Sequence, residues 1–79
     1  MRTLDRADLR TESQKTLKMI GDNLYALRMS EGKTLQEVAM EVAMSPVMIN
    51  EIEKGEYDLG LNQLFLLSEY YHVQLSDLL

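Results

Sequence analysis

Few side chains in this sequence have the chemistry and spacing that catalysis or metal binding requires. The 79 residues include no cysteine and a single histidine, His72, so a zinc site would need carboxylates for almost all of its ligands. Ser45 precedes a proline, which is typical of a helix cap, and Glu51 and Glu53 would point to different faces of a helix. The sequence also has no glycine-rich phosphate loop. We therefore expect no enzyme, no metal site and no cofactor.

Charge is distributed unevenly along the chain. Residues 1–18 carry five basic and three acidic side chains, a net charge of +2, whereas residues 19–79 carry three basic and ten acidic ones, a net charge of −7. A body this acidic repels the phosphates of DNA. Arg2, Arg6 and Arg10 recur at four-residue steps, either as a basic arm or, because acidic residues alternate with them, as a solvated row of ion pairs.

The hydropathy pattern predicts a soluble protein. No apolar run approaches the roughly 20 residues that span a bilayer. The polar first residues do not resemble a secretory signal, which needs an apolar stretch. We expect a cytoplasmic location and no contact with membranes.

The spacing of apolar residues predicts an all-α fold of five short helices. The first helix runs from Gln14 to about Ser30, and its apolar stripe consists of Leu17, Ile20, Leu24 and Leu27. Residues 1–13 lack such a stripe, so we interpret them as a frayed helix or a disordered arm. This places a single domain at residues 14–79.

Two short helices with a tight turn between them are predicted over about residues 35–54. Thr34 with Glu37 forms the sequence signature of a capping box, and Ser45 followed by Pro46 marks the start of the next helix. Ala39 is the small residue that a close, steep crossing needs, and Ala43 stands near the turn. The apolar residues that would seal the crossing are Val38, Val42, Met44, Ile49 and Ile52.

The C-terminal third is strongly apolar. A fourth helix begins at Leu61 and is expected to form the centre of the core, and His72 ends it with a group suited to the helix C-terminus. A last helical turn follows Gln74. Little chain remains to cover Tyr70, Tyr71, Leu75, Leu78 and Leu79, which favours a homodimer through the last two helices.

Residues 20–79, about three quarters of the chain, resemble the Cro/C1-type helix-turn-helix domain, also called the XRE family. The motifs that carry the resemblance are IGDNL (20–24), TLQEVA (34–39), INEIEKG (49–55), LNQL (61–64) and YYHVQLSDL (70–78). The resemblance implies a compact, five-helix, lambda-repressor-like DNA-binding domain. It also implies an ion pair between Arg28 of the first helix and Glu53 of the third.

The resemblance further implies that the second helix lies across the DNA backbone and that the third enters the major groove. The groove-facing residues would then be Pro46, Val47, Met48, Asn50 and Glu51, and the backbone contacts would involve Lys33, Leu35, Gln36 and Lys54.

These side chains are unusual for the recognition of DNA bases. Only Asn50 offers a bidentate amide for adenine, Glu51 could accept from cytosine, and the apolar residues could touch thymine methyl groups. Leu35 has no hydrogen bond to give a phosphate. If Lys33, Lys54 and one arginine each met a phosphate, the logarithm of affinity would fall with that of salt with a slope of about −2.7.

Two hypotheses follow. The first is a DNA-binding transcriptional regulator that acts as a homodimer on double-stranded DNA, which the resemblance favours. The second is the same fold turned to protein binding, as in an antirepressor or a toxin partner, with weak or no DNA binding. In that case Met40, Val47 and Met48 would form an adaptable apolar patch.

Overall fold

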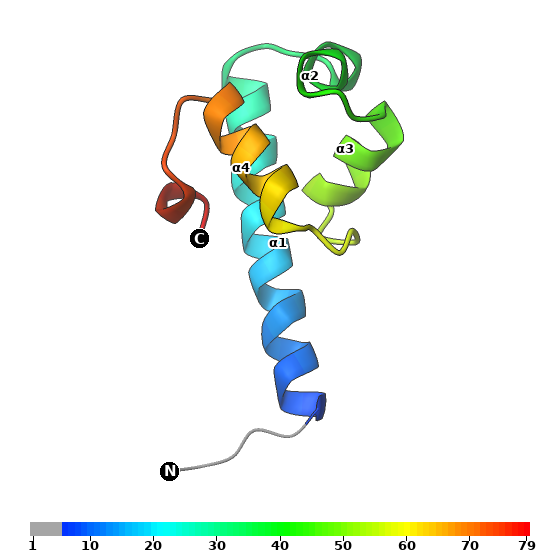
Figure 1. Ribbon diagram of the computed structural model, residues 1–79, viewed down its shortest axis with the longest axis vertical. Helices are drawn as coiled ribbons and strands as arrows, with labels where there is room; N and C mark the ends of the chain where they lie inside the picture. Colours follow the sequence, from blue (N-terminus) through cyan, green and yellow to red (C-terminus); the bar gives the residue numbers. More distant parts are fainter. Residues whose placement is uncertain (1–5) are drawn as a thin grey trace.

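The computed structural model describes the backbone from Arg6 to Leu79 and the side chains from Arg10 onward. The described residues form four α-helices and one 3₁₀ turn, with no strand among them (Figure 1). The elements are α1 (Arg6–Ser30), α2 (Leu35–Val42), α3 (Pro46–Glu53), α4 (Leu61–Tyr70) and the 3₁₀ turn η1 (Leu75–Leu78). The all-α prediction is therefore confirmed. The predicted fifth helix is a single 3₁₀ turn, because four residues are too few for an α-helix to repeat its hydrogen bonds.

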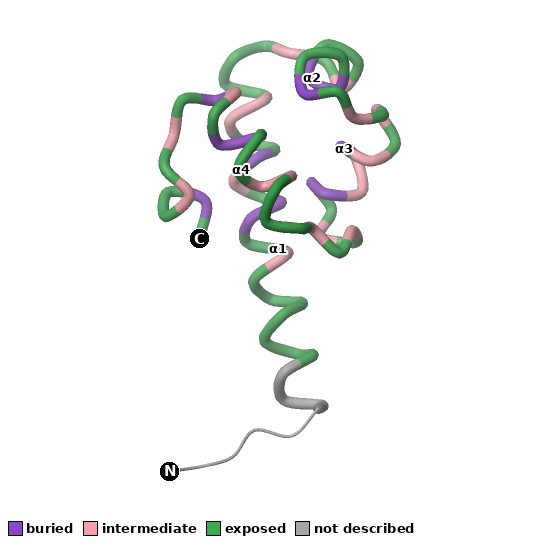
Figure 2. Tube along the Cα trace, in the orientation of Figure 1, coloured by how far each residue is buried: buried purple, intermediate pink, exposed green. Residues whose placement is uncertain are grey.

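The long helix α1 is the axis on which the other elements pack. The molecule measures 44 × 23 × 20 Å, and α2 and α3 lie together on one side of the C-terminal half of α1 (Figure 1). Helix α3 contacts both α1 and α2, α4 contacts α2, and η1 closes against α1 and α4. Residues 10–16 of α1 extend beyond this cluster and are exposed on every side (Figure 2).

Helix α1 begins at Arg6, eight residues before the predicted start at Gln14. Residues 10–16 carry no apolar stripe and remain exposed, although Glu12, Ser13 and Thr16 share a shallow groove with the loop after α3. A helix that is already nucleated gains one hydrogen bond for each further residue, so it can continue without tertiary contacts. Arg2 and the side chain of Arg6, which were considered as parts of a basic arm, lie outside the described residues.

Every α-helix is followed within two residues by a residue in the left-handed conformation. After each of these residues the next backbone N–H donates to a carbonyl five residues earlier, which satisfies an orphan acceptor of the last turn. The left-handed residues are Gly32 (φ 66°), Ala43 (φ 56°), Gly55 (φ 74°) and His72 (φ 57°). The chain can thus change direction within a few residues after each helix.

The helix starts are fixed by side chains that the sequence indicates. The Thr34 hydroxyl accepts from the Glu37 N–H at 3.1 Å, and the Glu37 carboxylate accepts from the Thr34 N–H at 3.3 Å. The Ser45 hydroxyl accepts from the Met48 N–H at 3.0 Å, and Pro46 occupies the first turn of α3. The N-termini of both helices of the helix-turn-helix are therefore defined by local chemistry.

The hydrophobic core is shared by the four α-helices and η1. Its buried residues are Ile20, Leu24, Val38, Ala39, Val42, Ile49, Ile52, Leu67, Tyr71 and Leu78. The prediction that the fourth helix forms the centre of the core is wrong, since Leu61, Phe65 and Leu66 on α4 are exposed. A helix that is apolar around most of its surface cannot bury every side in a domain this small.

Candidate nucleic-acid interface

The crossing of α2 and α3 depends on two alanines. Ala39 of α2 is buried and belongs to the same core cluster as Ile49 of α3. Ala43 adopts φ 56° and ψ 44°, and its N–H donates to the Ala39 carbonyl. This left-handed residue turns the chain sharply enough for α3 to begin three residues later. The small residues that the sequence suggested therefore stand where the geometry requires them.

Two glycines let α3 approach α1 closely. A Cβ atom on Gly21 would lie 2.5 Å from the Ile52 carbonyl oxygen and 2.6 Å from that of Glu53. A Cβ on Gly55 would lie 2.9 Å from the Cα of Lys18. The C-terminal end of α3 thus rests directly on the backbone of α1, and its position is fixed by backbone contact.

An ion pair holds the same junction. The Arg28 guanidinium donates to both carboxylate oxygens of Glu53, at 2.8 and 2.9 Å, and a third hydrogen bond of 2.9 Å reaches the Lys33 carbonyl. Both side chains are largely shielded from solvent, and the hydrogen bonds with Glu53 raise the pKa of Arg28. The ion pair that the resemblance implies is therefore present, and it joins α1, the loop before α2 and the end of α3.

The outer face of α3 is partly exposed, although Met48 packs against the core and contacts Gln63 of α4. Ile49 and Ile52 point into the core, whereas Val47 is 66% exposed and Lys54 at the end of the helix is also exposed. Asn50 and Glu51 are half-buried between them, as are Pro46 and Met48 at the start of the helix. The residues that the resemblance assigns to the major groove are thus all at least partly exposed along α3.

The residues assigned to the DNA backbone are less uniform. Gln36 is exposed on the first turn of α2, but Leu35 is half-buried and packs against the core. The Lys33 ammonium lies 5.2 Å from the centre of the Tyr70 ring, so a cation–π contact directs it toward α4. Gln36 therefore offers a polar group to solvent here, and Leu35 contributes packing.

Sequence reasoning missed a side-chain cluster beside α3. The Gln63 amide of α4 donates to the Tyr57 hydroxyl at 3.3 Å and lies 3.9 Å from the Met48 sulfur. Its oxygen accepts from the Gly60 N–H at 2.8 Å. The sequence contains only the signal for the last contact, since glutamine at the third position of a helix is typical of a cap. The approach of α4 to Met48 is tertiary.

Acidic groups surround this surface. Glu37 and Glu41 are exposed on α2, Glu51 lies on α3 itself, and Glu56 and Asp58 are exposed in the loop after it. Such charges oppose phosphate, so contact with DNA at this face depends on few cations.

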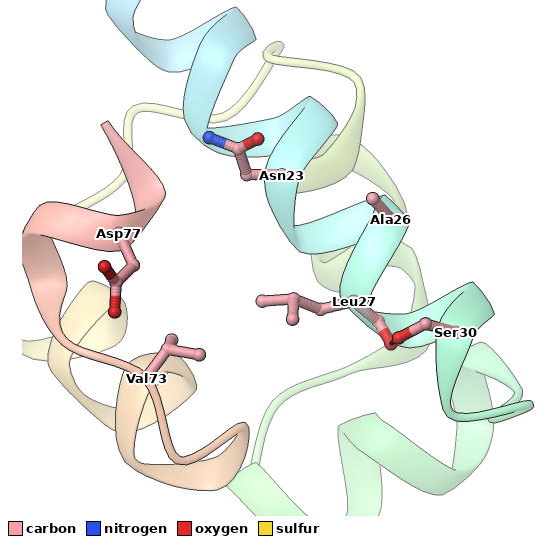
Figure 3. A pocket seen from close by; sticks show the side chains of 6 residues that line it. All are labelled: Asn23, Ala26, Leu27, Ser30, Val73 and Asp77. Atoms are coloured by element: carbon pink, nitrogen blue, oxygen red, sulfur yellow. Dashed lines mark hydrogen bonds between the residues drawn. The ribbon is translucent and has the colours of Figure 1, made fainter.

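A shallow groove of about 370 Å³ lies on another part of the molecule, between α1 and the C-terminal turn (Figure 3). Leu27 and Val73 line it, and Asp77 uses its carboxylate to accept from the Gln74 N–H at 2.9 Å. The Asn23 amide donates to the Leu78 carbonyl at 2.8 Å and ties the turn to α1. The polar groups of this groove thus serve the packing of η1.

Metal-binding clusters and membrane-spanning helices are both absent from the described residues. These residues contain no group of three or more histidine, cysteine, aspartate or glutamate side chains that could hold a metal ion. Within the same part of the chain, the helices are too short or too polar to cross a membrane.

The comparisons with known proteins agree with this geometry. The solved structure of the restriction-modification controller protein C.AhdI from Aeromonas hydrophila superposes with a TM-score of 0.75 at 19% identity, and the match covers 80% of this chain and 96% of that one. No curated protein sequence matches the chain. Residues 24–78 match a helix-turn-helix family model, which covers well over half of the sequence. The chain therefore belongs to this helix-turn-helix family, the Cro/C1-type or XRE group that its motifs resemble.

Proposed function

We propose that this protein is a DNA-binding transcription regulator that places α3 in the major groove of double-stranded DNA. The observation that carries the proposal is the outer face of α3, where Val47, Asn50 and Lys54 follow one another along a helix whose opposite face is buried. The family match and the fold of C.AhdI, a restriction-modification controller, support it. A regulator of this kind needs no catalytic group and acts where the DNA lies, in the cytoplasm.

The geometry favours a rigid reading helix. Glu53 is bound to Arg28, and Gly21 allows the end of α3 to rest on α1, so α3 keeps its orientation without a ligand. A preorganised surface loses less entropy on binding. On the phosphate side, Gln36 and Lys54 are the exposed polar groups among the proposed backbone contacts.

We further propose that the protein acts as a homodimer through α4 and the C-terminus. Leu61 is 71% exposed, Phe65 50% and Leu66 46%, and Leu79 after η1 is 61% exposed. Tyr71 and Leu78, which the sequence suggests for this interface, are instead buried within the monomer. Exposed leucines and a phenylalanine on one helix are typical of an interface. Two protomers would also double the small number of phosphate contacts.

DNA binding is tested by selecting sequences from a random double-stranded library at low salt and titrating the enriched sequence. We expect Lys54→Gln to weaken binding to all sequences and to reduce the salt slope by about 0.9. Asn50→Ala should leave the slope unchanged and relax the preference for one base pair. Each variant is the control for the other, because one should change the salt slope and the other should change the base preference. Failure of the wild-type protein to enrich any sequence would contradict the proposal.

The dimer is tested by light scattering at tens of micromolar. The variant Phe65→Ser with Leu66→Ser should give the mass of a monomer while its helical circular dichroism stays unchanged, because both side chains are already exposed. Met29→Ser, on the exposed side of α1, is the matched control and should remain a dimer. A monomeric wild-type protein at this concentration would rule out the interface.

A protein-binding role is the second candidate, and one observation favours it. Met40 on α2 is 81% exposed and lies in a shallow depression with Glu37 and Glu41. An exposed methionine framed by carboxylates suits a partner with an apolar side chain and basic neighbours. If the protein enriches no DNA in the selection above, this reading gains support over the first.

A further inference from the structure

The first turn of α3 presents only apolar side chains. Pro46 and Met48 are half-buried and Val47 is largely exposed, while the one nearby hydroxyl, that of Ser45, accepts the Met48 N–H as a helix cap. In helix-turn-helix complexes the N-terminal residues of the reading helix contact the base edges. Pro46, Val47 and Met48 therefore bring no side-chain donor to the bases, and their one side-chain acceptor is the thioether sulfur of Met48. The Ser45 hydroxyl before them, whose oxygen accepts the cap bond, keeps its O–H as the single donor beside this turn.

The major groove offers one apolar group, the methyl group of thymine. The edges of guanine, cytosine and adenine carry donors and acceptors that would lose water against valine or methionine without gaining a partner. We infer that the first turn of α3 is a reader of thymine methyl groups, with Val47 and Met48 as its contact residues. This inference rests on the DNA-binding function proposed above and specifies what that surface recognises.

Met48 needs to be held in place to take part. A methionine side chain has three rotatable bonds and adapts to many shapes, so alone it discriminates poorly. Here the Gln63 amide lies 3.9 Å from its sulfur, and Gln63 is itself fixed by the Gly60 N–H at 2.8 Å and by the Tyr57 hydroxyl at 3.3 Å. Gln63 is therefore a positioning residue, which acts on DNA recognition through Met48.

Asn50 lies one turn farther along the same face of α3. Its amide can bind adenine through two hydrogen bonds. The spacing along the helix thus gives a recognition order of thymine methyl groups first and an adenine beyond them.

The experiment begins with the DNA sequence enriched by selection and replaces each thymine in turn with deoxyuridine, which lacks only the methyl group. Affinity should fall about fourfold for each contacted methyl group. Replacing such a thymine with cytosine should weaken binding further, and 5-methylcytosine should restore part of the loss. If the protein binds DNA but removing the methyl group from any thymine leaves the affinity unchanged, recognition of thymine methyl groups is refuted and the DNA-binding proposal survives. If no DNA is bound, both fail.

Protein variants separate direct contact from effects on DNA shape. Val47→Ala should reduce the preference for thymine over deoxyuridine at one position, because alanine keeps only one of the apolar carbons that valine presents. Val47 is largely exposed, so the variant should fold normally, which circular dichroism checks. Met40→Ala, a matched change on α2, should keep the full preference. An unchanged preference in Val47→Ala at every thymine would overturn the role of Val47.

A separate variant tests whether Gln63 positions Met48. Gln63→Glu keeps the oxygen that accepts from the Gly60 N–H and removes the amide donor near Met48. Its added charge should lower the affinity for all DNA. The ratio of affinities for thymine and deoxyuridine should also fall, at a position that Val47→Ala leaves unaffected. Equal losses for both bases everywhere would show that Gln63 does not position Met48.

Discussion

The Arg28 guanidinium of α1 and the Glu53 carboxylate at the end of α3 form a two-pronged ion pair with hydrogen bonds of 2.8 and 2.9 Å. Both groups are nearly out of contact with water, with side-chain exposures of 11% and 6%. The pair spans 25 positions in sequence, so it joins the long helix to the proposed reading helix. It sets the orientation of α3 relative to the rest of the domain.

Breaking the ion pair between Arg28 and Glu53 should lower the stability of the protein. Glu53→Gln leaves the Arg28 charge buried without its counterion, and we expect a loss of about 3–5 kcal/mol in the free energy of unfolding. Urea denaturation at low temperature measures it. Lys18→Met, which breaks the exposed pair with Asp22, should cost less than about 1 kcal/mol. A small loss in Glu53→Gln, similar to that control, would show that the pair does not hold the junction.

Gly21→Ala should destabilise the protein although alanine favours helices. The new Cβ would lie 2.5 Å from the Ile52 carbonyl oxygen, so α1 and α3 must move apart, and we expect a net loss of about 1–3 kcal/mol. The control is Gln14→Ala on the exposed part of α1, which should change stability by less than about 0.5 kcal/mol. Thermal denaturation distinguishes them, and a more stable Gly21→Ala would contradict the close approach.

Two alanine-to-glycine substitutions should change the stability of the protein in opposite directions. Ala43 is exposed and left-handed, so Ala43→Gly relieves backbone strain and should stabilise the protein by about 0.5–1 kcal/mol. Ala39 is buried inside α2, and Ala39→Gly should destabilise it by about 1 kcal/mol or more. Urea midpoints measure both. If Ala43→Gly destabilised the protein, the left-handed conformation would not strain Ala43.

Stability should fall in alkaline solution because of Tyr71. Burial raises the pKa of its hydroxyl above the value of about 10 in the unfolded chain. The folded state therefore holds this proton more tightly, so the contribution is complete below about pH 10 and is lost as the pH rises toward the folded pKa. Tyr71→Phe should reduce this alkaline loss in unfolding titrations between neutral and alkaline pH. An equal loss in both proteins would contradict the assignment.

Local rules explain why much of the helix-turn-helix could be predicted. Thr34, Ser45 and Pro46 define helix starts through bonds within three residues, and Gly32 and Gly55 end helices through their own backbone freedom. Such contacts depend on neighbours in sequence, so the sequence contains their signal in full. The surface of α3 after Pro46 follows from the same spacing, since Ile49 and Ile52 fix which face is buried.

Other features depended on partners distant in sequence. Helix α4 was expected at the centre of the core because its residues are apolar, but only the packing decides that Leu67 is buried while Phe65 faces solvent. The contact of Gln63 with Met48 likewise exists only because α4 folds back on α3.

By itself, then, the amino-acid order determined an all-helical chain, the ends of its helices and the residues that α3 could present to DNA, because hydrogen bonds near in sequence and helical periodicity set these. Tertiary structure alone decided how α4 divides between core and surface, how closely Gly21 admits α3, and which side chain holds Met48. The physical reason is that burial and backbone contact between distant segments depend on which surfaces compete for a small core, and no local pattern encodes the outcome of that competition.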